Sequence, residues 1–328
     1  DEVIWRSYFK GWLEQRPEVW DNYTAGLRQD LAALEGDAGL RQAVHAAETA
    51  QTGLDYFDSW AAELIETGYL HNHARMWFAS IWIFTLKLPW RLGADFFLRN
   101  LLDGDPASNT LSWRWVAGLH TRGKPYVAQA SNIARFTEER FMPRAQELTQ
   151  SASGLEALEP GGLPECNPPR VPNAPQLHLP TALLLTEEDC RIEDFPFQDL
   201  ICTAAATLAA SPLRSPREVA QLVVRFEAGA LADVAQRSGL AVSAMQIGAP
   251  SDLARWALQS GAQQIVTPYV PVGPLRDWLA RAQPELEAAG ISLTEWRRDW
   301  DAMIWPHATA GFFKVKKQIP KFLRTICA

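Results

Sequence analysis

The chain is poor in the residues that mark several common classes of protein. It has only four cysteines, Cys166, Cys190, Cys202 and Cys327, and no two of them form a CxxC pair. A disulfide framework or a cysteine-ligated metal is therefore not indicated, and we expect the reduced thiols of a cytoplasmic protein. The longest apolar run ends at Lys87, before it reaches the roughly eighteen residues of a membrane span, so we expect no membrane segment.

Two further signals are missing from the sequence. No Gly-x-Gly-x-x-Gly follows the first predicted strand, which excludes the ordinary dinucleotide fingerprint. No secretion signal is visible, and because the chain starts at Asp1 without a methionine we expect it to lack an N-terminal part. The net charge of −7 argues against a protein that coats nucleic acid over its whole surface.

Tryptophan, in contrast, is abundant, and it gathers in one block. The stretch from Thr67 to Trp115 also contains Arg75 and the spaced pair Asp103 and Asp105. Burying charged groups is costly unless they are paired, so we expect an ion pair between Arg75 and one of these aspartates. A structural salt bridge in a helical core explains this pattern as well as a ligand site does. The tryptophans of the block are Trp77, Trp82, Trp90, Trp113 and Trp115.

Hydrophobic periodicity predicts that residues 1–150 form an all-helical domain. A helix from His71 to Leu86 is apolar around most of its circumference, which is typical of a buried helix, and Pro89 ends it. A second helix is expected from Arg91 to Leu102, where an Asp-Gly-Asp-Pro turn follows. Residues 20–66 also have helical spacing of leucines and alanines.

The second half of the chain changes character. Residues 151–180 are rich in proline and glycine and predict a linker. Residues 181–328 then alternate strands with helices, which is typical of a parallel, Rossmann-like α/β sheet, and they end in a basic tail. Residues 200–209 fit a strand or a helix equally well. The predicted strands are 181–186, 240–247, 264–270 and 291–296, and the predicted helices are 216–237, 251–260 and 274–289.

Positive charge is concentrated in two segments despite the acidic total. A solvated basic face and a surface that contacts phosphate both explain these clusters. The first cluster lies between Thr110 and Ala145 and consists of Arg114, Arg122, Lys124, Arg135, Arg140 and Arg144. The second lies in the C-terminal tail and consists of Lys314, Lys316, Lys317, Lys321 and Arg324.

The tryptophan-rich block resembles the flavin-binding core of the DNA photolyase and cryptochrome family. The motifs that carry the resemblance are Thr67-Gly68-Tyr69-Leu70-His71-Asn72-His73-Ala74-Arg75-Met76, then Trp90-Arg91-Leu92-Gly93, then Asp103-Gly104-Asp105 with Asn109, Trp113 and Trp115. The resemblance implies an all-helical FAD-binding domain. Residues 183–194, 288–291 and 311–315 in turn resemble segments of the family's antenna-type α/β domain, which implies that such a domain follows. The family has these domains in the opposite order, so the chain resembles a circular permutant.

The family resemblance implies roles for the residues of this block. Asn72, Arg75, Asp103, Asp105 and Asn109 would hold FAD, with Arg75 paired to Asp103 and Asn109 facing the N5 edge of the flavin. Trp113 and Trp90 fall on the proximal and middle positions of the family's electron-transfer chain. The distal position aligns near Asp37, so another aromatic residue completes the chain or it is interrupted.

The resemblance also implies a DNA substrate that contains pyrimidine dimers. Glu2, Trp5, Met76 and Trp115 would line the cavity for a flipped-out dimer, and the tryptophans would stack on it. His73 replaces a family arginine that is thought to meet DNA phosphate. Residues 2–6, Glu-Val-Ile-Trp-Arg, match a Glu-x-x-Trp-Arg pattern of the family. The family segment that binds the FAD pyrophosphate precedes this pattern and is absent from this sequence.

The resemblance does not extend to every cofactor found in the family. Lys124-Pro125-Tyr126 is similar to a segment that precedes an iron–sulfur cluster in one branch, but no cysteine follows it, so we expect no metal cluster. His71 and His73 lie two apart on a helix and make a poor metal pair, so no metal is assigned. The residues that would contact an antenna chromophore are not identifiable.

Three functions fit the sequence. The first is light-driven, FAD-dependent repair of cyclobutane pyrimidine dimers by electron transfer from reduced flavin. The second is a cryptochrome-like light-sensing flavoprotein without repair activity. The third is a flavin-free scaffold or binding protein, which the missing pyrophosphate segment favours.

Overall fold

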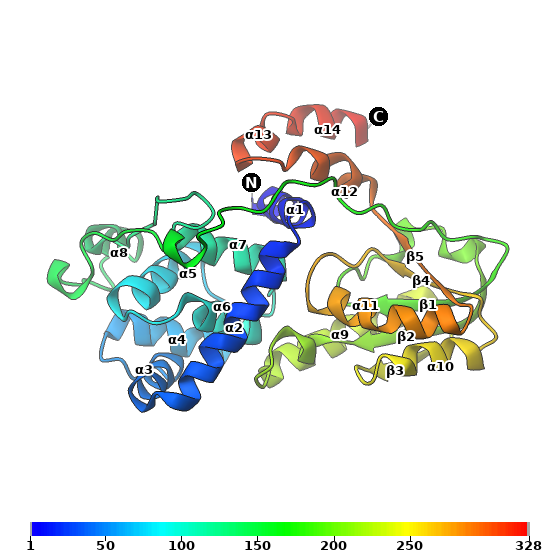
Figure 1. The fold of residues 1–328 in the computed structure, drawn as a ribbon, viewed down its shortest axis with the longest axis horizontal. Coiled ribbons are helices and arrows are strands. Elements are labelled where there is room, and N and C mark those ends of the chain that lie inside the picture. The colour runs from blue at the N-terminus through cyan, green and yellow to red at the C-terminus, as the bar shows by residue number, and fades with distance from the viewer. Residues whose placement is uncertain (1, 327–328) are drawn as a thin grey trace. The chain divides into compact units, whose positions relative to one another are not determined.

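The chain forms two compact units (Figure 1). The computed structural model describes residues 2–326, and it describes the side chains of residues 4–325. The helical unit consists of Arg16–Glu165, and the α/β unit combines Asp1–Gln15 with Cys166–Ala328. The predicted helical domain comprised residues 1–150, whereas the residues before Arg16 pack with the second half of the chain.

The helical unit is built from seven helices among the described residues, which cover much of the predicted helical region. Residues 20–66, which were predicted to be helical, lie in three helices that are separated at Asp37 and at the turn around Gly53. The helices are α2 (Glu18–Gly36), α3 (Ala38–Glu48), α4 (Asp55–Thr67), α5 (Asn72–Ser80), α6 (Trp90–Asn100), α7 (Pro106–Val116) and α8 (Ala130–Phe136).

The predicted long helix from His71 to Leu86 is present but changes its winding. α5 continues directly into a π-helix at Ile81–Thr85, and Pro89 precedes α6 as expected. Thr149 secures the wider turn, because its Oγ1 donates to the carbonyl oxygen of Phe84 at 2.7 Å. Such π-helical turns add one residue to the helix and are frequent at functional sites.

The α/β unit contains a five-stranded, all-parallel sheet with the strand order β3-β2-β1-β4-β5. This order confirms the predicted parallel α/β architecture, and residues 201–209 form a strand. The apolar run Ala182–Leu185 is buried on both faces of the central strand, as a parallel sheet requires. The strands are β1 (Pro180–Thr186), β2 (Ile201–Ala209), β3 (Val242–Gln246), β4 (Gln264–Pro268) and β5 (Ser292–Trp296).

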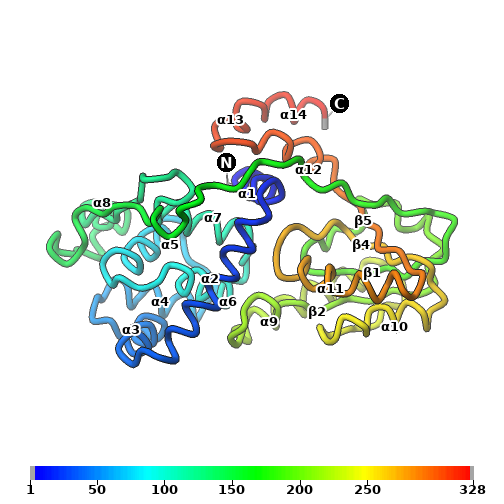
Figure 2. Tube along the Cα trace, viewed as in Figure 1, coloured from blue at the N-terminus to red at the C-terminus, as the bar shows by residue number. Residues whose placement is uncertain are grey.

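Helices cover both faces of the sheet. α9 (Gln221–Ser238) packs on one face, and α10 (Ser251–Gln259) and α11 (Pro274–Ala288) pack on the other. Of the remaining helices of this unit, α12 and α13 pack on α1 and α14 packs on α12, and Figure 2 follows the chain through them. These helices are α1 (Glu2–Glu14), α12 (Asp299–Ile304), α13 (Phe312–Lys316) and α14 (Ile319–Ile326).

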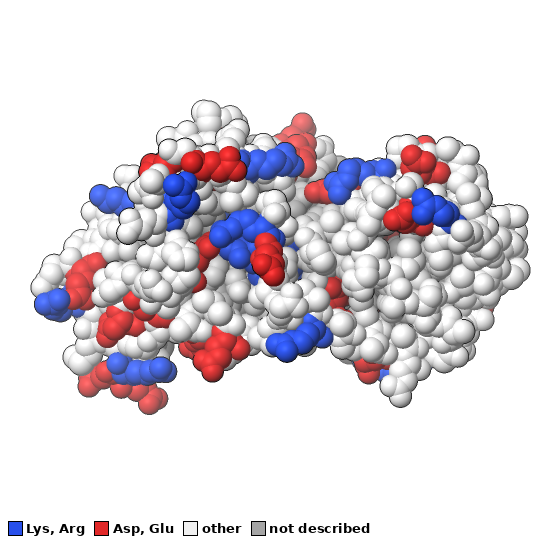
Figure 3. All heavy atoms as spheres, turned by 90° about the horizontal axis from the view of Figure 1, so that it is seen from below, with Lys and Arg blue, Asp and Glu red and all other residues white. Residues whose placement is uncertain are grey.

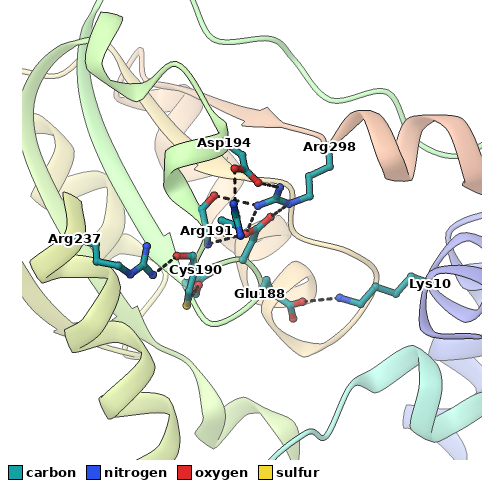
Figure 4. Close-up of polar contacts among 9 residues, drawn as sticks. Lys10, Glu188, Cys190, Arg191, Asp194, Arg237 and Arg298 are labelled. Carbon is teal, nitrogen blue, oxygen red and sulfur yellow. Dashed lines mark hydrogen bonds and ion pairs between the residues drawn. The ribbon is translucent and has the colours of Figure 1, made fainter. Parts of the chain in front are cut away.

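Ion pairs hold the loop that follows β1 (Figure 4). Arg298 binds Asp189 with its Nε at 2.5 Å from Oδ2, and it binds Asp194 with its Nη1 at 2.6 Å from Oδ2. Lys10 of α1 reaches Glu188 at 3.3 Å. The loop is therefore tied both to α1 and to the segment after β5. Within the described residues, no helix is long and apolar enough to cross a membrane, and no group of His, Cys, Asp and Glu side chains could hold a metal ion.

Candidate functional site

The candidate site lies in the helical unit, where the α4–α5 turn meets the α6–α7 turn. Gly68 ends α4 with a φ of 68°, a left-handed conformation that favours glycine. Its carbonyl oxygen accepts a hydrogen bond from the Leu102 backbone at 2.9 Å. This bond joins the two turns and places the start of α5 beside the residues that follow α6.

The predicted ion pair between Arg75 and Asp103 forms at this junction. Arg75 Nη2 lies 3.1 Å from both carboxylate oxygens of Asp103, and Arg75 Nε donates to the carbonyl oxygen of Leu70 at 2.8 Å. The side chains are 25% and 42% exposed, so the expectation of a buried pair is corrected. The pair lies at the rim of the helical core, because Asp103 lies in the turn after α6.

Asp105 and Asn109 occupy the first turns of α7 and are both 7% exposed. Asp105 caps the helix, since its Oδ1 accepts from the Ser108 backbone at 2.7 Å. Asn109 Nδ2 donates to the carbonyl oxygen of Ala94 on α6 at 2.8 Å. The Asn109 Oδ1 atom accepts no hydrogen bond from the described part of the chain, so a ligand's N–H group could use it.

The two predicted relay tryptophans are buried on neighbouring helices. Trp113 of α7 meets the rings of Trp82 and Phe97 edge-on, at centroid distances of 6.3 Å and 5.1 Å. Glycine is required at position 93 for this packing, because an added Cβ would lie 2.3 Å from Trp113 Cη2. Trp90 lies at the start of α6, one turn before Gly93.

Two aromatic residues that the sequence analysis did not select extend from Trp90. The ring of Tyr23 lies 5.8 Å from that of Trp90, and the ring of Trp20 lies 5.3 Å from that of Tyr23. Both belong to α2, and their spacing of three residues places them on one face of the helix. Asp37, the aligned distal position, is the N-cap of α3, so it is not an aromatic relay member.

Several buried polar atoms on α6 and α7 have no hydrogen-bond partner among the described residues. The neutral groups among them are Trp90 Nε1, Trp113 Nε1, Ser108 Oγ and Thr110 Oγ1. Buried polar groups without partners are rare in folded proteins and require an explanation such as a ligand. Together with Asn109 Oδ1 and the charged pair at the rim, they fit a heteroaromatic ligand that both donates and accepts hydrogen bonds. The residues present therefore fit a flavin.

The predicted substrate residues of the helical unit lie on α5 and α7. Met76 and Trp115 are partly exposed, and Trp115 stacks on Tyr126 at 5.3 Å. His73 stacks on two aromatic rings, with centroid distances of 4.6 Å to Phe136 and 5.6 Å to Trp77. Asn72, the first residue of α5, is exposed.

The other two predicted substrate residues belong to the α/β unit. Trp5 stacks on Phe312 with a centroid distance of 3.6 Å and an interplanar angle of 13°, so part of its surface is used in packing. The side chain of Glu2 lies outside the described part of the structure. Their roles toward a substrate stay predictions.

Sequence reasoning missed a buried ionic network in the helical unit. Asp95 is fully buried and accepts from Arg99 Nε at 2.9 Å, and Arg99 also binds Glu48 at 3.0 Å. Burial raises the pKa of Tyr23 well above its ordinary value, and the negative charge of Asp95 adds to the shift. The spacing of four residues between Asp95 and Arg99 on an apolar helix was the signal that could have found this network.

The fold and the site define a two-part protein, with a helical ligand-binding unit and an all-parallel α/β unit. Residues 1–146 match the family described as the FAD binding domain of DNA photolyase. The chain therefore contains a domain of the photolyase FAD-binding family, and its α/β region follows that domain in sequence.

Curated relatives match the same part of the chain. A deoxyribodipyrimidine photo-lyase from Streptomyces griseus is 37% identical over 125 residues, which are 38% of this chain and 26% of that protein. The photo-lyase of Neurospora crassa is 32% identical over 157 residues, or 48% and 25% of the two chains. That of Escherichia coli is 29% identical over 126 residues, or 38% and 26%. The chain thus spans about a quarter of these relatives. No solved structure matches.

Proposed function

We propose that the protein is a flavoenzyme that repairs cyclobutane pyrimidine dimers in DNA with light. The observation that carries the proposal is Asn109, a buried amide whose nitrogen is held by Ala94 and whose oxygen is left for a ligand. It lies in a domain of the FAD-binding family, in a core with several unpartnered polar atoms. When bound, FAD would supply the light absorption and the electron for dimer splitting.

Each residue of the site would contribute a definite interaction. Asn109 Oδ1 is an acceptor, so it favours the protonated N5 of reduced flavin. The Asp105 carboxylate would accept from an N–H group of the ring, and its position is fixed by its bond to the Ser108 backbone. Arg75 and Asp103 would stay paired beside the ring, and Asn72 would contact it from the first turn of α5.

The substrate residues would recognise a pyrimidine dimer that has flipped out of the DNA duplex. Trp115 of the helical unit and Trp5 of the α/β unit each offer an aromatic face on which a base can stack, and Met76 and Glu2 would also contact the substrate. His73 would contact DNA with the part of its ring that is not stacked on Phe136 and Trp77. On the face shown in Figure 3, cations and acids are interspersed, so phosphate contacts would depend on local clusters.

A matched pair of asparagines tests the role of Asn109. Asn100 is also 7% exposed and also donates its amide to a carbonyl group on α6, that of Phe96, at 2.7 Å. Both Asn109→Ala and Asn100→Ala should lower the free energy of unfolding by about 1 kcal/mol. Only Asn109→Ala should shift the reduction potential of the bound flavin to more negative values. Equal potentials in the two variants would show that Asn109 does not contact the flavin.

Trp113 and Trp90 would deliver electrons from the surface to photoexcited oxidised flavin. We expect Trp113→Phe to slow photoreduction, measured as bleaching of the flavin bands under blue light, while prereduced enzyme still repairs dimers. Trp296→Phe, in the α/β unit, is the control and should alter neither rate. Equal loss of both activities in Trp113→Phe would show that Trp113 is only structural.

The direct test is dimer repair by the prereduced, full-length protein under blue light. Restored thymine absorbance would support the repair function. A protein that retains flavin and bleaches reversibly but restores no absorbance would instead be a light sensor of the cryptochrome type. A protein without flavin after incubation with FAD would be the scaffold alternative.

A further inference from the structure

The C-terminal helices α13 and α14 form a strongly basic surface on the α/β unit. Five of the residues from 314 to 324 are cations, and the sequence has no Asp or Glu between residues 302 and 328, although the whole chain carries −7. A local concentration of charge against the overall sign is the electrostatic signature of a site for a polyanion.

The apolar side of this pair of helices is already occupied. Phe312 stacks on Trp5 of α1, and Phe322 packs against His307 with a ring distance of 5.2 Å. Val315 and Ile319 are also buried. Figures 1 and 2 show the two helices beside α12, with which α14 makes contact. The helices are therefore docked on their own unit, and their orientation is fixed.

The side that faces solvent combines cations with an exposed aromatic ring. Lys317, Lys321 and Arg324 are all exposed. Phe313 is 72% exposed and lies one residue before Lys314, which is also exposed. Proteins that bind nucleic acid strands combine these two features, because cations follow the phosphates and aromatic rings stack on the bases.

We propose that this outer face of α13 and α14 is a second DNA-binding surface, which contacts the phosphate backbone through Lys317, Lys321 and Arg324. An anionic membrane is a less suitable partner, because a helix that lies in a membrane must insert its apolar face, and here that face is buried against α1 and α12. The choice of DNA as the polyanion rests on the proposed function, but the surface would bind undamaged DNA without flavin or light.

The test is the affinity of the full-length protein for a short undamaged DNA duplex, measured in the dark at several salt concentrations. We expect the triple variant Lys317→Ala, Lys321→Ala and Arg324→Ala to bind about tenfold or more weakly. The slope of log K against log salt should become shallower by about 2 to 3, since each phosphate contact contributes about 0.9.

The control removes the same charge elsewhere on the same unit. Arg225, Arg255 and Arg281 are exposed on α9, α10 and α11, and their triple alanine variant should bind DNA like the wild type. Equal weakening in both triple variants would mean that only net charge matters and would overturn the proposal. Unchanged binding in the C-terminal variant, at an unchanged melting temperature, would overturn it as well.

The aromatic ring gives a second, independent readout. Phe313→Ala should weaken binding of single-stranded DNA about fivefold or more, because one base would lose its stacking partner. Phe226, which is 55% exposed on α9, provides the matched control, and Phe226→Ala should have no effect. Binding to phosphatidylserine vesicles that the C-terminal triple variant abolishes, without any change in DNA affinity, would assign the surface to a membrane and refute the proposal.

These outcomes are separate from those of the proposed function. A protein that repairs no dimers can still show the predicted loss of DNA affinity, and a repair-competent protein can fail to show it. The binding assay uses neither light nor lesion, so its failure would leave the flavin site untouched.

Discussion

The two units treat their buried polar groups differently. In the α/β unit, buried carboxylates have several hydrogen-bond donors: Glu227, 1% exposed, accepts from the Ala210 and Ser211 backbones and from the Ser211 hydroxyl. In the helical unit, buried atoms such as Trp90 Nε1 and Trp113 Nε1 have no partner in the described structure. Saturated groups indicate a structural role, whereas a cluster of unpartnered groups on two adjacent helices indicates a ligand.

This difference between the two units in how buried polar groups are hydrogen-bonded has exceptions. In the α/β unit, Thr186 Oγ1, Thr267 Oγ1 and Trp305 Nε1 are also buried without a partner among the described residues. These three are neutral groups, and each costs less to leave unpaired than a carboxylate does, whereas the carboxyl group of Asp301 is a charged exception in the same unit. The comparison therefore predicts that substitutions in the α/β unit change stability, and that substitutions near α6 and α7 change flavin binding as well.

Glu227→Ala should have the largest effect on stability. It leaves the two backbone N–H groups and the Ser211 hydroxyl buried without an acceptor, so we expect a loss of about 3–5 kcal/mol in the free energy of unfolding. Urea denaturation of the α/β unit measures it. Glu285→Ala, at an exposed position on α11, should change stability by less than about 0.5 kcal/mol. Similar losses in both variants would contradict the saturated-network account.

Gly93→Ala tests the packing that holds Trp113. The new Cβ would lie 2.3 Å from Trp113 Cη2 and 2.9 Å from Trp82 Cε2, so one of the rings must move. We expect a loss of about 1–3 kcal/mol in the free energy of unfolding, together with reduced flavin content. Gly229→Ala, in α9 with no neighbouring atoms within 4 Å, should instead stabilise by about 0.5–1 kcal/mol. A fully flavin-loaded Gly93→Ala protein would refute the placement of the ligand near Trp113.

Asp301 on α12 is a carboxyl group of the α/β unit with no hydrogen-bonded partner among the described residues. Burial raises its pKa to about 6, and Lys10 opposes the shift. The native state therefore holds the proton more tightly than the unfolded state, whose carboxyl pKa is about 3.9. Stability should fall as the pH rises from about 4 to about 6, and the cost is fully present above that range.

Asp301→Asn should remove this pH dependence. We expect the variant to be more stable than the wild type at neutral pH by about 1–2 kcal/mol, with no gain near pH 4. Chemical denaturation across the pH range measures the difference. Asp299→Asn, at an exposed position two residues earlier, should follow the wild-type curve. A stabilisation that does not vary with pH would show that Asp301 does not titrate in this window.

Asp103→Asn should change stability least. The ion pair with Arg75 is partly exposed, so its loss should cost less than about 1 kcal/mol. Flavin retention after gel filtration should nevertheless fall, because Arg75 would lose the carboxylate that orients it at the rim of the site. Asp252→Asn, which breaks the exposed pair with Arg255 on α10, is the control and should leave flavin content unchanged. Full flavin occupancy in Asp103→Asn would contradict the proposed position of the ring.

Local patterns in the sequence predicted much of this architecture. The parallel sheet follows from apolar strands that alternate with helices, and the Arg75–Asp103 pair follows from charges in an apolar block. Burial of the pair could not be predicted, because it depends on where the α6–α7 turn lies relative to the core. The packing of α1 with the C-terminal half could not be predicted either. It depends on contacts between residues that are far apart in the sequence, such as the hydrogen bond from Tyr269 to Glu14.

The aromatic residues that pack next to Trp90 could not be predicted from the sequence for the same reason. Tyr23 and Trp20 are separated from Trp90 by about seventy residues of sequence, and no local pattern links the two segments. Asn109 could be selected by its motif, but its bond to Ala94 depends on how α6 and α7 pack. The sequence could thus predict which residues belong to the candidate site. It could not predict which of their polar atoms are left without a partner and are available to a ligand.

The most direct test of the account is the flavin content of the full-length protein after incubation with FAD and gel filtration, read from the absorption spectrum. We predict about one flavin per chain, because the neutral polar atoms without partners that support the flavin proposal lie on α6 and α7 of the described structure. The bands should bleach under blue light with a reductant. A colourless protein with its secondary structure intact would show that the aromatic core is only a core and would contradict the central claim.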